Sequence, residues 1–218
     1  MKANSQRVKG KNFRPLHGKP LFRWILDSLL AIDTIDLVVI NTDARDILAE
    51  NGLVDSERVL IRDRKPELCG DAVSMNKILA DDIQAVPATT YLMTHTTNPM
   101  LGRETIFAAL EMLRANAAAD SLFSVNPMQT RFYRASDGSA VNHDPDNLIQ
   151  TQDLELWYEE NSCLYLFTAD SFAKTKARIG KHPILFPTPK MESVDIDTEE
   201  DWKLAEAVAM IKTKKAAR

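Results

Sequence analysis

Short apolar runs alternate with amphipathic stretches over the first 125 residues of this 218-residue chain, and this alternation restricts the fold more than any other feature. Residues 35–42 (IDLVVINT) form a nearly continuous apolar run rich in β-branched side chains, which is typical of a strand buried on both faces of a parallel sheet. Residues 20–32 carry leucine and isoleucine at helical spacing instead. Repeated βα units of this kind predict an α/β fold, a mainly parallel sheet with helices on both faces.

The same patterns place the other elements within one domain, residues 1–218. Strands are predicted over residues 58–62, 89–97, 120–125, 163–168 and 192–197. Helices are predicted over residues 44–52, 74–86, 102–118, 169–178 and 198–215. Ser74 and Thr198 are candidate N-caps, and the last helix has an acidic first turn and a basic last turn, as the helix dipole prefers.

Residues 126–162 break this pattern. Their apolar periodicity is weak, and residues 134–147 (RASDGSAVNHDPDN) are dense in turn-forming residues. We therefore predict an excursion from the sheet that serves as a lid or as an oligomerisation arm.

Composition narrows the class of protein. A net charge of −4 gives no basic excess that would indicate a nucleic-acid partner. Cys69 and Cys163 are far apart and match no metal spacing, so we expect two reduced thiols. The polar N-terminus and the lack of a long apolar run predict a soluble cytoplasmic protein with no membrane partner.

Two carboxylates near the C-terminus are candidates for a metal site. If residues 193–197 form a strand, Asp195 and Asp197 project from the same face. Adjacent carboxylates repel, and a hard cation such as Mg²⁺ relieves that repulsion while also taking phosphate oxygens and water as ligands. An acidic strand end that leads into a capped helix explains the same residues, so the spacing leaves both interpretations open.

The opening residues MKANSQRVKGKN are basic and contain small side chains, a combination that can bind a phosphate chain. They match neither the P-loop nor the dinucleotide fingerprint, and taken alone they favour a solvated basic tail. Three further stretches are weak candidates by themselves, with ordinary turn chemistry as the alternative: residues 64–76, which enter a helix, residues 94–99, which include His95, and residues 158–167, which include Asn161.

In their order and separation these stretches resemble the acylneuraminate cytidylyltransferase family, the CMP–sialic acid synthetases, which is related to the CMP-Kdo synthetases. The likeness covers essentially the whole chain. The family loop R-x-x-S-K-x-x-x-x-K-N is matched by Lys2-Ala3-Asn4-Ser5-Gln6 and Lys11-Asn12, and GKPL (18–21) precedes the first helix in the same way. Residues 64–74 resemble the family segment R-P-x-x-L-A-x-D, and HTTNP (95–99) falls where the family has Q-P-T-S-P. TQDLELWYEEN (151–161) resembles R-Q-D-L-P-x-x-Y-x-E-N-G. ESVDIDTEEDW (192–202) resembles the metal-binding D-I-D-T-x-x-D end of the family.

This resemblance implies a Rossmann-like fold of the nucleotide-diphospho-sugar transferase type. It also implies a Mg²⁺-dependent enzyme that transfers CMP from CTP to a 2-keto-3-deoxy sugar acid and releases pyrophosphate, for cell-surface polysaccharide biosynthesis. The enzyme would be a homodimer whose arm, residues 126–162, reaches toward the partner.

The resemblance also implies residue roles. Lys11, Asp195 and Asp197 would be catalytic, with the two aspartates holding Mg²⁺. The nucleotide would be bound by Lys2, Asn4, Ser5, Arg7, Lys11, Asn12, Arg64, Ser74 and His95. Gln152 and Asn161 would bind the sugar.

The chain departs from the family pattern at several positions, where it has Lys2, Gln6, His95, Thr151 and Ser162. Lys2 keeps the charge of the family arginine but loses its bidentate geometry. At Thr151 the family often has an arginine that suits the sugar carboxylate. These departures keep two alternatives open: a non-catalytic nucleotide-binding relative, and a nucleotidyltransferase for Kdo or another sugar.

Family members place a short apolar strand directly before the opening loop, and this chain begins at the loop. The resemblance therefore implies that the first strand is absent here. We expect unpaired ladder groups and uncovered apolar side chains on the neighbouring strands.

Overall fold

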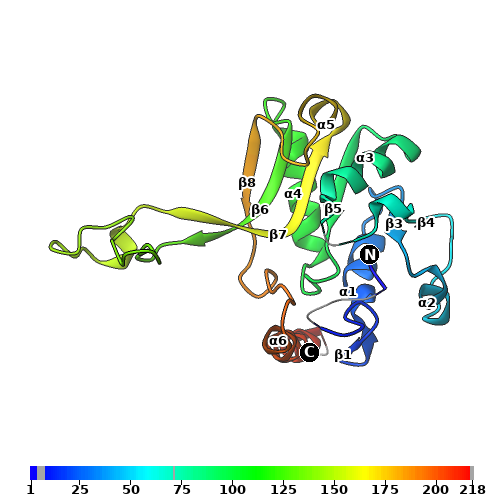
Figure 1. The fold of residues 1–218 in the computed structure, drawn as a ribbon, viewed down its shortest axis with the longest axis horizontal. Helices are drawn as coiled ribbons and strands as arrows, with labels where there is room; N and C mark the ends of the chain where they lie inside the picture. The colour runs from blue at the N-terminus through cyan, green and yellow to red at the C-terminus, as the bar shows by residue number, and fades with distance from the viewer. Residues whose placement is uncertain (4–7, 71, 217–218) are drawn as a thin grey trace.

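The computed structural model describes residues 1–3, 8–70 and 72–216, and its larger sheet has four strands in the order β5-β7-β6-β8 (Figure 1). β7 runs antiparallel to β5 and to β6, whereas β6 and β8 are parallel. The bounds are Thr90–Thr94 for β5, Ser121–Met128 for β6, Trp157–Thr168 for β7 and Pro183–Pro187 for β8.

A second sheet pairs β3 (Val38–Thr42) with β4 (Val59–Asp63) in parallel. A small antiparallel ribbon joins β1 (Pro15–Leu16) to β2 (Lys19–Pro20). In the part of the chain that the structure describes, no ladder joins β3 to β5. The predicted α/β class is confirmed, with the strands divided between sheets and β7 running against its neighbours.

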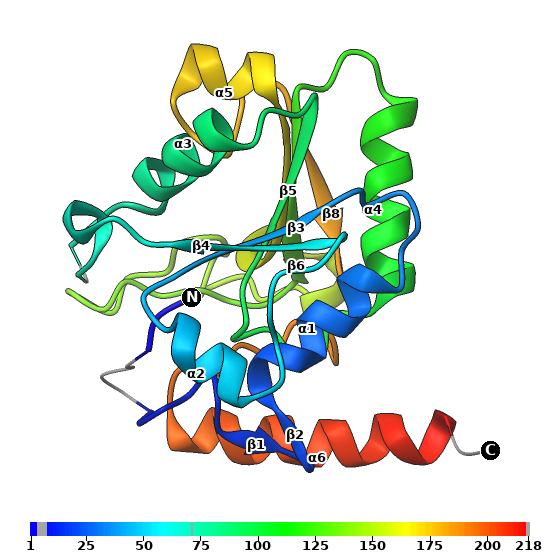
Figure 2. The same ribbon diagram turned by 90° about the vertical axis from the view of Figure 1, so that its right-hand side faces the viewer.

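Helices cover both faces of the four-stranded sheet, as predicted (Figure 2). α3 and α5 lie on one face, α4 lies on the other beside α1, and α6 crosses below. The bounds are Leu21–Leu30 for α1, Arg45–Glu50 for α2, Met75–Ala85 for α3, Arg103–Ala115 for α4, Ala169–Thr175 for α5 and Glu199–Ala216 for α6. Single 3-10 turns occur at Pro66–Leu68 and Thr151–Asp153.

Side chains that alternate along β7 fill the apolar layers on both faces of the four-stranded sheet. Leu164 and Leu166 are fully buried in the cluster that contains side chains of α1 and α4. Tyr165 and Phe167 point the other way, into the cluster under α3 and α5. Because both faces of this strand are apolar, it appears in the sequence as a continuous apolar run rather than as an alternating pattern.

The C-terminal helix is fixed against the opening segment. Thr198 caps α6 as predicted, because its Oγ1 accepts a hydrogen bond from the Asp201 N–H at 3.2 Å. The Arg14 guanidinium lies 4.1 Å from the centre of the Trp202 ring and pairs with Glu199 at 2.7 Å. Ser74 precedes α3 without a side-chain capping bond. The contact between α6 and residue 14 brings the two ends of the chain together.

The predicted excursion is a long arm that projects from the body (Figure 1). β6 and β7 continue beyond the core as an antiparallel ladder that ends with Met128 opposite Trp157. The register shifts between Phe123 and Val125, and Ser162 has a φ of 58°. A bulge of this kind bends the ribbon, so the arm leaves the plane of the sheet.

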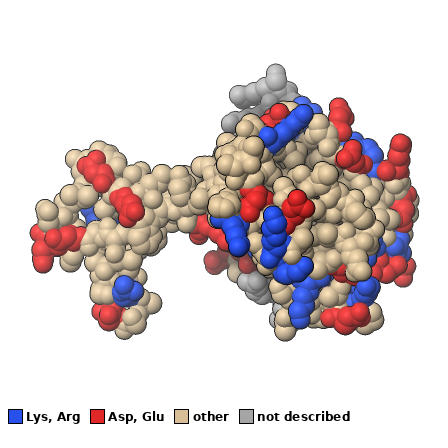
Figure 3. Space-filling model, turned by 90° about the horizontal axis from the view of Figure 1, so that it is seen from above, with Lys and Arg blue, Asp and Glu red and all other residues tan. Residues whose placement is uncertain are grey.

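Charges of both signs are interspersed over the face shown in Figure 3. Among the described residues, no helix has the length and apolar character needed to cross a bilayer.

Candidate active site

The C-terminal acidic segment meets the opening loop. Lys11 is almost fully buried, and its Nζ donates a hydrogen bond to the Ile196 carbonyl and lies 3.4 Å from Asp197 Oδ1. The Ile196 N–H donates to the Thr97 carbonyl at 2.9 Å, which ties this segment to the residues after β5. Residues 193–197 do not form the predicted strand, because their backbone bonds go to these loop residues rather than to a ladder.

The two aspartates influence each other as the sequence predicted. Although Asp195 reaches solvent, the protein atoms around it disfavour its charged form and raise its pKa. The negative charge of Asp197 raises the pKa further, while a hydrogen bond from Thr97 and the charge of Lys11 oppose the shift. Asp195 and Asp197 are the residues that would hold a divalent cation here, and Lys11 pairs with Asp197.

Asp201 has a different role. Its Oδ2 accepts hydrogen bonds from Asp197 N at 3.0 Å and from Thr198 N at 2.7 Å, and its pKa is lowered chiefly by the Thr198 hydroxyl. This carboxylate shapes the turn into α6. The described residues contain no group of three or more His, Cys, Asp or Glu side chains suited to a metal, so an ion between Asp195 and Asp197 would complete its shell with water or substrate oxygens.

The opening loop is described in part. Asn12 Nδ2 donates to the Lys2 carbonyl at 2.8 Å, and Asn12 Oδ1 accepts from Thr96 Oγ1 at 2.6 Å. Asn12 thus joins the loop to the end of β5, beside Lys11. The predicted nucleotide ligands Asn4, Ser5 and Arg7 lie outside the described residues.

The remaining nucleotide candidates sit at the ends of β4 and β5 and at the start of α3. Arg64 Nε donates to Asn41 Oδ1 at 2.8 Å, and its Nη2 donates to the Asn41 carbonyl at 2.9 Å. Ser74 is exposed directly before α3. His95 follows β5, and its pKa is lowered to about 4, first by burial and then by the positive charges of Arg178 and Lys11.

The two sugar candidates are separated. Gln152 lies on the arm, where its carbonyl accepts from Gln129 and its amide donates to Gln150. Asn161 is buried at the base of the arm, and its Nδ2 donates to Asn126 at 2.9 Å and to Thr188 at 2.7 Å. Since Asn161 is engaged in this internal network and Gln152 belongs to the part of the arm beyond the last β6–β7 pair, Met128 with Trp157, the structure does not bring them together.

Comparison with known proteins identifies the family. The profile of the cytidylyltransferase family matches residues 1–216. The chain belongs to the cytidylyltransferase family.

This cytidylyltransferase is similar, over nearly its whole length, to bacterial enzymes named for nonulosonic acids. It is 23% identical to a pseudaminic acid cytidylyltransferase of Campylobacter jejuni, covering 94% of this chain and 91% of that protein. It is 27% identical to a CMP-N,N'-diacetyllegionaminic acid synthase of Legionella pneumophila, with the same coverage. The structure of a CMP:2-keto-3-deoxy-manno-octonic acid synthetase complexed with CTP has the same fold, with a TM-score of 0.65, 14% identity, and coverage of 97% of this chain and 96% of that one. The predicted family and the assignment as an enzyme are confirmed.

Sequence reasoning missed one group at the candidate active site of this cytidylyltransferase. Arg178 stacks on the Tyr165 ring at 3.8 Å, and Tyr165 donates to Glu160 and lies 3.0 Å from the Ser162 hydroxyl. Glu160 and Ser162 fall in a motif that the sequence singled out. Arg178 follows α5 without any motif, so only the fold reveals it.

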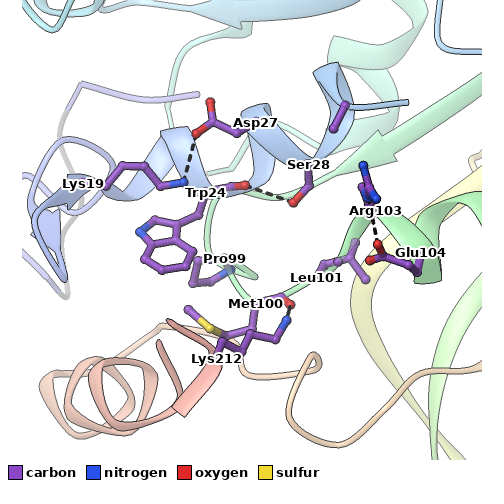
Figure 4. Close-up of a pocket in the computed structure, with 12 residues that line it drawn as sticks. Lys19, Trp24, Asp27, Ser28, Pro99, Met100, Leu101, Arg103, Glu104 and Lys212 are labelled. Carbon is purple, nitrogen blue, oxygen red and sulfur yellow. Dashed lines mark hydrogen bonds and ion pairs between the residues drawn. The ribbon is translucent and has the colours of Figure 1, made fainter. Parts of the chain in front are cut away.

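A separate pocket of about 350 Å³ lies between α1, the start of α4 and α6 (Figure 4). Its wall includes Trp24, Met100 and Lys212, and an ion pair of 2.9 Å joins Lys19 to Asp27 at its edge. None of the predicted site residues lines it. The chemistry of Lys11, Asp195 and Asp197 therefore belongs to a different part of the surface.

Proposed function

We propose that this cytidylyltransferase transfers CMP from CTP to the anomeric hydroxyl of a nonulosonic acid or a related 2-keto-3-deoxy sugar acid, with release of pyrophosphate. The observation that carries the proposal is the convergence of Lys11 and Asp197, 3.4 Å apart and 186 residues apart in sequence, in a chain of this family. Relatives named for pseudaminic and legionaminic acid support the substrate class.

In this proposal Lys11 neutralises charge on the triphosphate, since nucleotidyl transfer depends mainly on positioning and on stabilising developing charge. Asp195 and Asp197 would hold Mg²⁺, which would offset charge at the α-phosphate when bound. His95 is uncharged at neutral pH because its pKa is about 4, so it contacts the nucleotide as a neutral hydrogen-bonding group.

A homodimer in the cytoplasm is part of the same proposal. The arm exposes the apolar side chains Leu148, Ile149 and Leu156, which suits contact with a second copy. Cys69 and Cys163 are both free thiols, which suits a reducing compartment.

A two-way substrate panel tests the reaction. Pyrophosphate release is measured with CTP, UTP, ATP and GTP against nonulosonic acids, Kdo and sugar 1-phosphates. We expect release only with CTP and a sugar acid. Release with a sugar 1-phosphate or with another nucleotide would overturn the proposed substrate class, and CTP binding without any product would favour a non-catalytic relative.

A further inference from the structure

Arg178 is held by three elements at the end of the sheet where the candidate active site lies. Its guanidinium stacks 3.8 Å from the centre of the Tyr165 ring on β7, and Nη2 lies 3.0 Å from the Tyr165 hydroxyl. Nη1 contacts Met93 Sδ on β5 at 3.7 Å, and the backbone N–H donates to Asn76 in the first turn of α3 at 3.3 Å. With 23% of its side chain exposed, this arginine is held in one orientation before any ligand arrives.

The guanidinium keeps donors for a ligand. It carries five N–H groups, and within the described part of the chain two of them have acceptors, on Tyr165 and Met93. Glu160 lies 3.6 Å away as an ion pair but takes its hydrogen bond from the Tyr165 hydroxyl. Its carboxylate therefore balances the charge of Arg178 and leaves N–H groups of the guanidinium available.

The position of Arg178 links it to the predicted catalytic residues. Met93, which it contacts, lies on β5 two residues before His95, and β5 ends at Thr94 between them. The charges of Arg178 and Lys11 both act on the His95 imidazole. Arg178 and Lys11 are therefore both near His95, and Lys11 is the one that also pairs with the acidic segment.

We propose that Arg178 binds the carboxylate of the sugar acid and thereby determines that the acceptor must be an acid. The inference rests on the proposed function and deepens it. The predicted sugar ligands Gln152 and Asn161 are uncharged, and the Asn161 amide is already bonded to Asn126 and Thr188. A fixed guanidinium pairs with a carboxylate through two parallel hydrogen bonds, which gives both charge and geometric selection.

The test compares a sugar acid with its methyl ester, which keeps the reacting hydroxyl and removes the negative charge. For the wild type we expect kcat/KM to favour the acid by roughly 10- to 100-fold, the range of a charged hydrogen bond. In Arg178→Gln this preference should fall to about threefold or less through a higher KM for the acid, while KM for CTP stays within about twofold. Arg178→Lys should be intermediate because lysine keeps the charge without the paired geometry.

Arg114→Gln is the matched control, since Arg114 is an exposed arginine on α4 with 80% of its side chain accessible. Arg114→Gln should show the same preference for the acid over its methyl ester as the wild type. An unchanged acid preference in Arg178→Gln, or a rise confined to KM for CTP, overturns the inference. If Arg178→Gln does not fold, the same ratio measured with Arg178→Lys decides the question.

The behaviour of the wild type distinguishes a failure of the proposed function from a failure of the inference about Arg178. If the wild type turns over no sugar acid, the proposed reaction is wrong, and calorimetric titration with the acid and its ester tests Arg178 separately. Binding of the acid that Arg178→Gln abolishes supports the inference. Absent binding, or binding that the substitution leaves unchanged, overturns it.

Discussion

At the scale of single residues, Asp197 is the side chain whose loss should affect catalysis most. Asp197→Asn removes the negative charge opposite Lys11 and one of the two proposed metal ligands. We expect kcat to fall by at least about 100-fold, in line with the loss of one electrostatic contributor to a transition state. Steady-state pyrophosphate release at saturating CTP measures this.

Glu200→Gln is the control for that substitution, because Glu200 is an exposed acid three residues away on the first turn of α6. Its kcat should match the wild type. Turnover by Asp197→Asn within twofold of the wild type would show that the carboxylate has no catalytic role.

The lowered pKa of His95 predicts how the free energy of unfolding depends on pH. Its folded-state pKa of about 4 lies below the ordinary value of 6.5, so the unfolded chain binds the proton more tightly. The contribution of the neutral imidazole is therefore fully present above pH 6.5 and is lost as the pH falls toward 4. In denaturant titrations over this window, the wild type should lose stability more steeply than His95→Gln. Parallel curves would mean that the folded protein does not disfavour the charged imidazole.

The family resemblance, rather than residue identity alone, anticipated part of the site. It gave Lys11, Asp195 and Asp197 a shared role, whereas the basic opening residues by themselves favoured a solvated tail and the carboxylate spacing left two interpretations open. Asn161 shows the limit, since its amide bonds to Asn126 and Thr188, which are distant in sequence and which no local pattern identifies. Arg178 was missed for a similar reason: its neighbours Tyr165 and Met93 come together only through strand pairing.

At the scale of elements, the loop before β8 depends on Gly180. The Asp120 carboxylate accepts hydrogen bonds from the Lys181 N–H at 2.9 Å and from the His182 N–H at 3.0 Å. A Cβ at position 180 would lie 2.2 Å from Asp120 Oδ1 and 2.4 Å from Ser171 Oγ, so the carboxylate would have to leave its donors.

Gly180→Ala should therefore lower the free energy of unfolding by about 1–3 kcal/mol, the usual cost of overpacking. Chemical denaturation measures this, with Lys181→Ala as an exposed neighbouring control. A midpoint for Gly180→Ala equal to that of the control would contradict the described packing.

The elements that the sequence missed share a physical cause. β8 begins and ends with proline, which signals a loop, yet its interior residues pair in parallel with β6. Residues 193–197 alternate like a strand, but the Ile196 N–H bonds to a loop carbonyl. In both cases the partner, rather than the local pattern, decides whether a segment joins a sheet, whereas α1 and α4 were predicted by their own periodicity.

At the scale of the whole molecule, the arm predicts the oligomeric state. Leu148 is 62% exposed on the arm, and Ile149 beside it is 45% exposed. If a second copy covers them, Leu148→Asp should convert a dimer into the 24.5 kDa monomer. Light scattering coupled to size-exclusion chromatography measures this change.

Val54→Asp is the matched control, because Val54 is also 62% exposed but lies on the body between α2 and β4. It should leave the mass unchanged. A wild type of monomeric mass would exclude the arm as a dimer contact, and an equal effect of both substitutions would show that the arm has no special role.

The central claim is that this chain joins CMP to a sugar acid at the site where Lys11 meets Asp197. The most direct test is ³¹P NMR of a reaction that contains CTP, Mg²⁺ and a nonulosonic acid. The account predicts that the three CTP resonances give way to one phosphodiester signal and one pyrophosphate signal of twice its intensity, because pyrophosphate holds two of the three phosphorus atoms, and that Asp197→Asn produces neither. CTP that stays intact with every sugar acid, or that yields CMP and pyrophosphate without a phosphodiester, would contradict it.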